Sequence, residues 1–198
     1  VLASMIVGFP YQTPEIIKEE CDGLLALKPA FSQFLIYGPV PGTPFFDHVK
    51  KNKLFHQEVE DDPKTNYWRK GTGFYSLVKH QTMTASQIEE LQADCFQQDF
   101  RRLGPSIYRT VEVWLNGYLK WKDSPIAIMR KKAELFAQFV RSAYPAFLPG
   151  RLFGPTKATR RDLRQFEKRC HEVLGKPTLI EKLLGIGAVA ASALTALT

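Results

Sequence analysis

Two short apolar segments, each followed by a loop rich in proline and glycine, constrain the fold of this chain most strongly. Residues 3–8 and 32–37 have the length and apolar content of buried strands. Pro10 ends the first segment, because proline cannot donate to a strand ladder and biases the preceding residue towards extended backbone. The second segment ends in Gly-Pro-Val-Pro-Gly-Thr-Pro, residues 38–44. The sequence therefore predicts two strands that each end in a loop.

A helix is predicted between the two strands, over residues 14–27. Thr13 can cap it, Pro14 suits its first position, and Glu15 faces the positive end of its dipole. A strand, a helix and a strand within about 40 residues form one βαβ unit, whose strands are parallel. Both loops then leave the carboxyl ends of their strands, the edge where α/β sheets and barrels bind ligands. Ordinary turns without a ligand are the alternative.

The motifs MIVGFPYQT and QFLIYGPVPGTPFF together resemble the last third of a radical S-adenosylmethionine (radical SAM) barrel, in particular the subgroup with an N-terminal cobalamin-binding domain. The fifth strand of that superfamily carries Gly-x-Ile-x-Gly-x-x-Glu beside the adenine of the cofactor. Ile6 and Gly8 match this pattern, whereas Ser4 stands where its first glycine would be and Gln12 stands near its acidic position. The Pro-x-Pro-Gly-Thr-Pro loop after the sixth strand matches residues 39–44.

The resemblance covers residues 1–56 and continues more loosely through GFYSLVKH and FRRLGPSIYRT. It implies an α/β fold, with one βαβ unit of a partial TIM-type barrel followed by a mostly α-helical C-terminal region. It also implies the adenine-side wall of a SAM site, formed by Ile6, Gly8, Gln12, Tyr37, Pro39, Pro41 and Gly42. In that site Ile6 and Gly8 would line the adenine, and Gln12 would position the nucleoside. Tyr37 and the proline loop would close the floor.

The superfamily binds a [4Fe–4S] cluster through a Cys-x-x-x-Cys-x-x-Cys loop, and no cysteine of this chain has that spacing. Cys21, Cys95 and Cys170 lie on apolar helical faces, as buried thiols commonly do. Scattered cysteines indicate a reducing compartment, so we expect a cytoplasmic protein. The resemblance thus implies a C-terminal fragment or a truncated gene product, with the cluster and cobalamin bound by missing N-terminal parts. The intact enzyme would carry out a radical modification, such as methylation of an unactivated carbon in a small-molecule or lipid-like substrate. The fragment alone would be inactive.

The pattern becomes wholly helical from the capping box Thr84-x-x-Gln87 onwards. Three further helices are expected, starting near Ile107, Ser124 and Thr159, with an irregular loop over residues 145–155 because that stretch holds three prolines and two glycines. The predicted organisation is a barrel part at 1–57, a linker at 58–83, a helical domain at 84–177 and an apolar tail helix at 178–198.

The linker and the histidines leave several alternatives. Acidic residues 58–63 have no interleaved His or Cys, which favours a solvated loop over a metal site. Residues 66–75 mix aromatic side chains, cations and glycines. They could stack nucleobases, cap the mouth of the barrel or simply pack in the core, and the resemblance favours the cap. The four histidines have no metal-binding or catalytic spacing. Among them, His80 lies in a segment that resembles the family and is the first to mutate.

Positive charge gathers in the C-terminal half, where residues 120–182 contain 15 Lys and Arg against 6 Asp and Glu. A basic helical surface can bind nucleic acid or anionic lipid, so the alternative function is a non-enzymatic binding module for an acidic partner. After the capping box Thr178-x-x-Glu181, residues 183–198 carry no charge, yet this run is shorter than the roughly 20 residues that span a membrane. The tail favours contact with a membrane surface over nucleic acid, and a loosely docked or disordered terminus is the remaining alternative.

Overall fold

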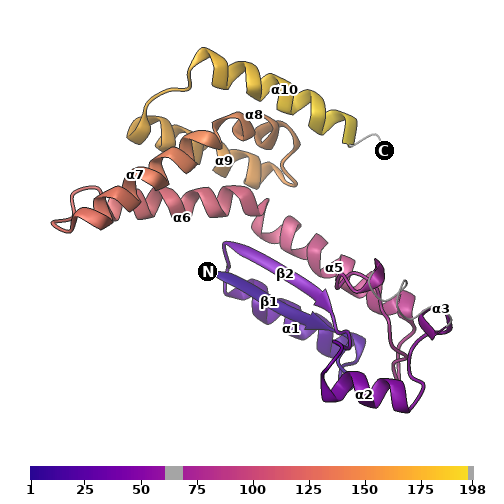
Figure 1. Cartoon of the computed structure of the whole chain (residues 1–198). Coiled ribbons are helices and arrows are strands. Elements are labelled where there is room, and N and C mark those ends of the chain that lie inside the picture. The colour runs from indigo at the N-terminus through magenta and orange to yellow at the C-terminus, as the bar shows by residue number, and fades with distance from the viewer. Residues whose placement is uncertain (61–68, 196–198) are drawn as a thin grey trace. The chain divides into compact units, whose positions relative to one another are not determined.

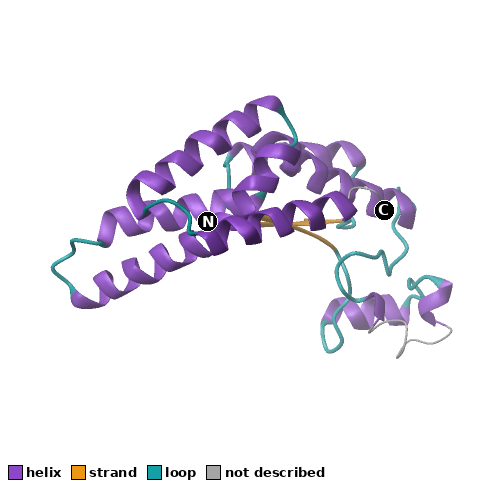
Figure 2. Ribbon diagram, turned by 90° about the horizontal axis from the view of Figure 1, so that it is seen from above, coloured by secondary structure: helices purple, strands orange, loops and turns teal. Residues whose placement is uncertain are grey.

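The structure of the chain is a computed structural model that describes residues 1–60 and 69–195 (Figure 1). The residues form two compact units, residues 1–102 and residues 103–198. Most of the described residues are helical, and the described strands form one parallel two-stranded sheet (Figure 2). The chain is therefore an α/β protein with a helical bulk. The domain boundaries predicted from the sequence stay predictions.

The two strands of the first unit, β1 (Leu2–Val7) and β2 (Phe31–Ile36), pair in parallel, which confirms the βαβ prediction. Their register sets Val7 opposite Ile36, and both side chains are buried together with Phe34. These side chains lie at alternate positions of their strands and so share faces of the sheet. Burying a side chain of this kind contributes about 1.5–3 kcal/mol. The sheet thus supplies part of the core of this unit.

Helix α1 (Pro14–Ala26) connects the strands, as predicted. The Thr13 hydroxyl accepts a hydrogen bond from the backbone N–H of Ile16 at 3.4 Å, and Pro14 occupies the first turn, where its missing N–H costs no intrahelical bond. The buried face of the helix consists of Ile17, Cys21 and Leu25.

Helix α5 (Ala85–Leu103) begins at the predicted capping box. The backbone N–H of Thr84 donates to the Gln87 side chain at 2.8 Å, and the N–H of Gln87 donates to the Thr84 hydroxyl at 3.2 Å. The apolar side chains that the helix buries are Ile88, Leu91 and Cys95.

Polar side chains of α5 form hydrogen bonds with residues of β2, the strand whose other side pairs with β1. Gln92 Nε2 donates to the carbonyl oxygens of Phe34 and Gly73, at 2.7 Å each. The buried carboxylate of Asp99 accepts a hydrogen bond from the Ser32 hydroxyl at 2.7 Å. Because unpaired strand groups away from water are costly, the bond to the Phe34 carbonyl stabilises β2 at the edge away from β1, and the Ser32–Asp99 bond joins the side chains of the strand and the helix.

Two short helices follow the sheet, α2 (Pro44–Lys51) and α3 (Gln57–Glu60). The Thr43 hydroxyl caps α2 by accepting from the N–H of Phe46 at 3.3 Å. A second small core forms around these helices, and its buried members are Val49, Phe55, Val59 and Leu77.

An antiparallel bridge between Phe55 and Val78 ties the chain after α2 to the segment that precedes α5. The backbone N–H of Lys79 donates to the Leu54 carbonyl at 2.8 Å in the same bridge. The predictions for the acidic stretch at residues 58–63 and the aromatic stretch at 66–75 fall partly on residues 61–68, which lie outside the described residues.

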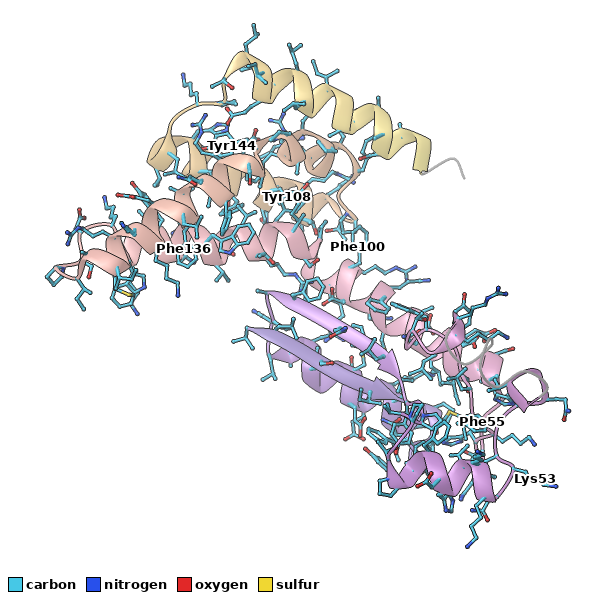
Figure 3. All side chains as sticks on the ribbon, in the orientation of Figure 1. Lys53, Phe55, Phe100, Tyr108, Phe136 and Tyr144 are labelled. Carbon is cyan, nitrogen blue, oxygen red and sulfur yellow. The ribbon has the colours of Figure 1, made fainter. Side chains whose placement is uncertain are left out.

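The second unit is built from helices. They are α6 (Ser106–Trp121), α7 (Ala127–Ser142), α8 (Tyr144–Phe153), α9 (Lys157–Leu174) and α10 (Leu179–Thr195). Figure 1 shows α6 alongside α7, and α10 alongside α8. Tyr108 and Tyr144 are labelled among the side chains that fill this unit in Figure 3. Its buried core consists of Tyr108, Val111, Leu115, Val140, Tyr144, Phe147, Leu163 and Cys170.

Helix α8 corrects the expectation of an irregular loop at residues 145–155. Pro145 lies in the first helical turn, where its missing N–H leaves no hydrogen bond unmade, and only Pro149 lies inside the helix. Burial of Tyr144, Phe147 and Gly150 in the core holds the segment helical. Tertiary packing therefore outweighs the local signal of the prolines.

The start of α9 is a second correction. Thr156 caps this helix rather than Thr159, because the Thr156 hydroxyl accepts from the Thr159 N–H at 3.0 Å. At α10, the predicted capping box is confirmed: the N–H of Thr178 donates to the Glu181 carboxylate at 2.6 Å, and the N–H of Glu181 donates to the Thr178 hydroxyl at 3.2 Å. Within residues 1–60 and 69–195, no helix combines the length and the apolar content that crossing a membrane requires.

Candidate functional site

A cavity of about 350 Å³ opens at the carboxyl ends of β1 and β2. Gly8 and Tyr37, the residues that follow the two strands, line it together with Pro10, side chains of α2 and the segment 76–81. Figure 3 labels Phe55 beside α2, at this end of the unit. Ligand pockets commonly measure about 300–1,000 Å³, so this cavity has the size of a small-molecule site.

Gln12 fixes the loop that follows β1. Its side chain is 1% exposed, and its Oε1 accepts hydrogen bonds from the backbone N–H groups of Gly8 at 2.6 Å and Phe9 at 2.8 Å. Its Nε2 donates to the Ile6 carbonyl at 3.1 Å and to the Glu20 carboxylate at 2.6 Å. The amide thus uses both of its N–H groups and both oxygen lone pairs within the unit. Gln12 and Ile6 lie outside the lining of the cavity, where they hold the shape of the loop.

His80 joins the segment before α5 to the same loop. Its Nδ1 accepts a hydrogen bond from the backbone N–H of Thr82 at 3.2 Å, so in the neutral ring the proton lies on Nε2. That nitrogen is 3.0 Å from the carbonyl oxygen of Phe9, to which it donates. The same carbonyl accepts from the N–H of Gln12 at 2.9 Å. One wall of the cavity is therefore fastened to the loop after β1 by a hydrogen bond of His80.

A row of aromatic rings connects the two strand-end loops. Phe9 lies between Tyr11, with ring centroids 5.6 Å apart, and Tyr37, at 4.5 Å. The Tyr37 ring also stacks on Phe45 of α2 at 4.5 Å, with an angle of 29° between the ring planes. Contacts of this kind add about 0.5–1.5 kcal/mol beyond the burial of area. The row holds the two loops together and gives the cavity an aromatic wall.

The polar part of the lining comes from α2 and from residues 76–81. His48, Lys79 and His80 contribute basic groups, and Ser76 contributes a hydroxyl. Lys79 Nζ donates to the Lys53 carbonyl at 3.2 Å, which fixes the position of the cation. An aromatic wall beside basic groups suits a ligand with a flat ring and an anionic group.

The structure brings together two of the residues predicted to form the adenine side. Gly8 and Tyr37 line the cavity, whereas Pro39 is buried and Pro41 and Gly42 are exposed outside its lining. The predicted contacts of these residues with adenine stay predictions. His48, Ser76 and Lys79 were missed as site residues, although GFYSLVKH, which holds the last two, was already part of the resemblance.

Gly8 is required by the backbone. Its φ is +89°, which residues with an L side chain rarely adopt. A Cβ atom added there would lie 3.2 Å from Cγ2 of Ile88 in α5, closer than ordinary van der Waals contact. The space next to Gly8 is therefore filled by the protein in that direction.

Acidic and aromatic groups flank the loop on the side of α1. Hydrogen bonds to its own backbone N–H and to Thr13 lower the pKa of Glu15, which keeps a negative charge at the start of α1. Burial, together with the charge of Glu20 and a hydrogen bond to it, raises the pKa of Tyr11. Both groups thus keep their ordinary charge states at neutral pH.

Among the residues that the structure describes, no three His, Cys, Asp or Glu side chains gather in a way that could hold a metal ion. Cys21 and Cys95 line one small cavity in the first unit, whereas Cys170 lies in the second unit. An iron–sulfur cluster requires several thiolates around one centre, so the cysteines of this chain do not fit a [4Fe–4S] cluster.

No protein-family model matches the chain, and no solved structure matches it. Over 90 residues the chain is 31% identical to a protein of Pyrococcus horikoshii named "Uncharacterized methyltransferase PH0819". The match covers 46% of this chain and 18% of that protein, so the chain spans less than a fifth of the relative's length. The similarity therefore concerns a small part of a longer protein.

Proposed function

We propose that this chain is the carboxyl-terminal part of a radical SAM enzyme, in which β1 and β2 are two of the parallel strands of a TIM-type barrel. The two strand-end motifs support this assignment, and parallel pairing is the arrangement that such a barrel requires. The similarity to a protein named as a methyltransferase supports methyl transfer as the reaction class. The substrate class is a small or lipid-like molecule with an unactivated carbon.

One observation carries the proposal: a cavity of small-molecule size lies at the carboxyl ends of two parallel strands and is lined by the first residue after each. Ligands of barrels and open α/β sheets bind at this edge. The aromatic row beside the cavity offers a flat apolar surface to an adenine, and the basic groups of His48 and Lys79 suit the carboxylate of S-adenosylmethionine.

The residues of this chain would bind and orient the nucleoside end of the cofactor. Tyr37 would exclude water from one wall, while Gln12 and His80 hold the loop after β1 by hydrogen bonds to its backbone. S-adenosylmethionine, when bound and reduced, supplies the radical chemistry of the superfamily. The cluster and cobalamin would be bound by other parts of the intact protein, because the cysteines of this chain do not fit the cluster.

Saturation-transfer NMR of the 198-residue chain with S-adenosylmethionine tests the proposal. We expect saturation to reach the adenine protons, and to be lost in Tyr37→Ala but kept in Tyr37→Phe. Tyr11→Ala is the matched control, because Tyr11 belongs to the same aromatic row and lies outside the lining of the cavity. Equal transfer to the adenine in wild type and Tyr37→Ala, or no transfer in either, would reject this site.

A second candidate function is binding to an anionic membrane surface, and the orientation of α10 favours it. The residues that α10 turns inward are mostly small: Gly185 is buried, and Ala188 and Ser192 are half-buried. A Cβ atom on Gly185 would lie 3.4 Å from the Pro145 carbonyl, so α10 approaches α8 closely there. The large apolar residues point outward instead, and each is 58–73% exposed: Leu179, Ile180, Leu183, Leu184 and Ile186.

Charge complementarity supports an anionic membrane as the partner of this outward face. Residues 103–198 contain 16 Lys and Arg against 7 Asp and Glu. An anionic membrane attracts such a surface by about 1 kcal/mol for each nearby cation. Arg141 holds the start of α10 by a paired contact with Glu181 at 2.7 Å and 3.0 Å, so the helix is fixed with its large side chains outward. Such a helix would lie in the membrane interface.

Flotation of the chain with vesicles tests this second function. We expect it to float with vesicles of phosphatidylcholine and phosphatidylserine, and less with phosphatidylcholine alone. The double variant Leu183→Gln/Ile186→Gln should lose binding, while Ala190→Gln, at another exposed position of α10, should keep it. Equal flotation of all variants would show that α10 does not contact the membrane. Binding that is lost in high salt would assign the membrane contact to the basic helices instead.

A further inference from the structure

Two of the three free cysteines meet between α1 and α5. Cys21 of α1 and Cys95 of α5 are each 4% exposed and line one cavity of about 220 Å³. Each thiol shifts the pKa of the other, so the two side chains lie within interaction range. The residues that share this cavity include the charged side chains of Lys18, Asp22 and Asp94. The pair therefore lies close enough to interact, beside a cavity that a small reagent can enter.

The two thiols have different environments. The hydrogen bond from Cys95 lowers the pKa of Cys21, and the positive charge of Arg102 acts in the same direction. The same hydrogen bond and burial raise the pKa of Cys95. Arg102 is held nearby through its ion pair with Asp22. Cys21 is therefore the thiol that forms a thiolate and attacks, and Cys95 is the thiol that keeps its proton.

We propose that Cys21 and Cys95 form a dithiol that a hydroperoxide oxidises to an intramolecular disulfide between α1 and α5. The Cys21 thiolate attacks one oxygen of hydrogen peroxide, the O–O bond breaks, and protonation of the leaving hydroxide gives water and a sulfenic acid on Cys21. The Cys95 sulfur then attacks the Cys21 sulfur, the S–O bond breaks, and the hydroxyl leaves with the Cys95 proton as a second water. Two thiols are oxidised, and one peroxide is reduced to two waters.

The disulfide would tie α1, which follows the loop after β1, to α5, whose Ile88 lies against Gly8. It would thus cross-link the two helices that border the sheet. Cys170 offers an internal control, because it is fully buried in the core of the second unit and burial raises its pKa to about 12. If the reagent reacted only with unfolded protein, it would oxidise Cys170 as readily as Cys21 and Cys95.

Treatment of the reduced 198-residue chain with hydrogen peroxide, followed by non-reducing peptide mapping, tests the proposal. We expect the intact mass to fall by that of two hydrogen atoms, and a single peptide link between Cys21 and Cys95. Thiol titration of the denatured protein should count three thiols before oxidation and one afterwards. Cys21→Ser and Cys95→Ser should each abolish the link, and Cys170→Ser should leave it intact.

A second probe does not depend on oxidation. Phenylarsine oxide bridges two neighbouring thiols with release of water, so the folded chain should bind one equivalent, and each single serine variant of the pair should bind none. Oxidation of Cys21 to a sulfinic acid without a link, a link that includes Cys170, or a link only between two copies of the chain would overturn the proposal. Failure to bind phenylarsine oxide in the folded state would also overturn it.

Discussion

The side-chain oxygen of Gln12 lies 2.6 Å from the backbone nitrogen of Gly8 and accepts its hydrogen bond. This contact closes the loop after β1 onto itself, and the second contact of the same amide, to the Glu20 carboxylate at 2.6 Å, fastens the loop to α1. The sequence pattern places Gln12 near an acidic position of the family. In this structure a carboxylate at that position would face Glu20 directly.

Gln12→Glu should therefore destabilise the first unit. The new carboxylate can still accept from Gly8 and Phe9, but it cannot donate to Ile6, and it repels Glu20. We expect a loss on the order of 1–3 kcal/mol in the free energy of unfolding, the usual cost of an unsatisfied buried polar group. Urea titration followed by circular dichroism measures it.

The double variant Gln12→Glu/Glu20→Gln is the matched control for that change. It restores the hydrogen bond between positions 12 and 20 with donor and acceptor exchanged, and it removes the like-charge pair. We expect it to recover part of the lost stability, although the Ile6 carbonyl stays without its donor. A double variant no more stable than Gln12→Glu would contradict the assigned network.

Gly8→Ala should cost more stability than Gly42→Ala. Both glycines have positive φ, +89° and +86°, so both substitutions bring a backbone cost of about 1–2 kcal/mol. Only Gly8 has a close neighbour, Ile88, while nothing lies within 4 Å of a Cβ atom at Gly42. Thermal unfolding of the two variants measures the difference. In a protein that already carries Ile88→Ala, the change Gly8→Ala should lower the unfolding midpoint less than it does in the wild type. Equal midpoints for the two single variants would refute the close contact.

His80→Leu should loosen the loop after β1. It removes the donor to the Phe9 carbonyl, which also accepts from Gln12 N–H, and a hydrogen bond of this kind contributes about 0.5–1.5 kcal/mol. Hydrogen exchange should become faster at the Gln12 amide. His48→Leu is the control, because His48 lines the same cavity without a bond to this loop. Equal exchange in both variants would show that His80 does not hold the loop.

The stability of the second unit should fall between pH 10 and 12. Burial raises the pKa of Tyr108 from 10.0 to about 12. In this window Tyr108 loses its proton in the unfolded chain but keeps it in the folded unit. The contribution of Tyr108 to the stability is therefore complete below pH 10 and is lost as the pH rises through the folded pKa. Tyr108→Phe should flatten the slope of the urea midpoint against pH. An unaltered slope in Tyr108→Phe would contradict the assignment.

Local chemistry explains which elements the sequence predicted well. Thr13 and Pro14 start α1, and Thr84 with Gln87 starts α5, because capping depends on a few neighbouring residues. Helix α8 was missed because it depends on distant contacts. The hydroxyl of Tyr108 donates to the Ala146 carbonyl, and a Cβ atom on Gly150 would clash with that hydroxyl, so the glycine serves close packing rather than a loop.

In the candidate site, too, some features depend on the local sequence and others on contacts between distant residues. Gly8 and Tyr37 were predicted from the family resemblance, and the parallel pairing that was predicted from the βαβ pattern places both at one edge of the sheet. The bond between His80 and Phe9 joins residues 71 positions apart in the sequence, so no local pattern reveals it. The role of Gln12 was also hidden, since its four partners become neighbours only when the loop folds back on α1.

Amide NMR of the isotope-labelled chain during titration with S-adenosylmethionine tests the central claim most directly. The amides of Gly8, Phe9 and Gly38 lie in or beside the two strand-end loops and report on the cavity. We predict saturable shifts of these amides, with the resonances of residues 103–198 unchanged. No saturable shift, or shifts confined to residues 103–198, would contradict a cofactor site at the carboxyl ends of β1 and β2.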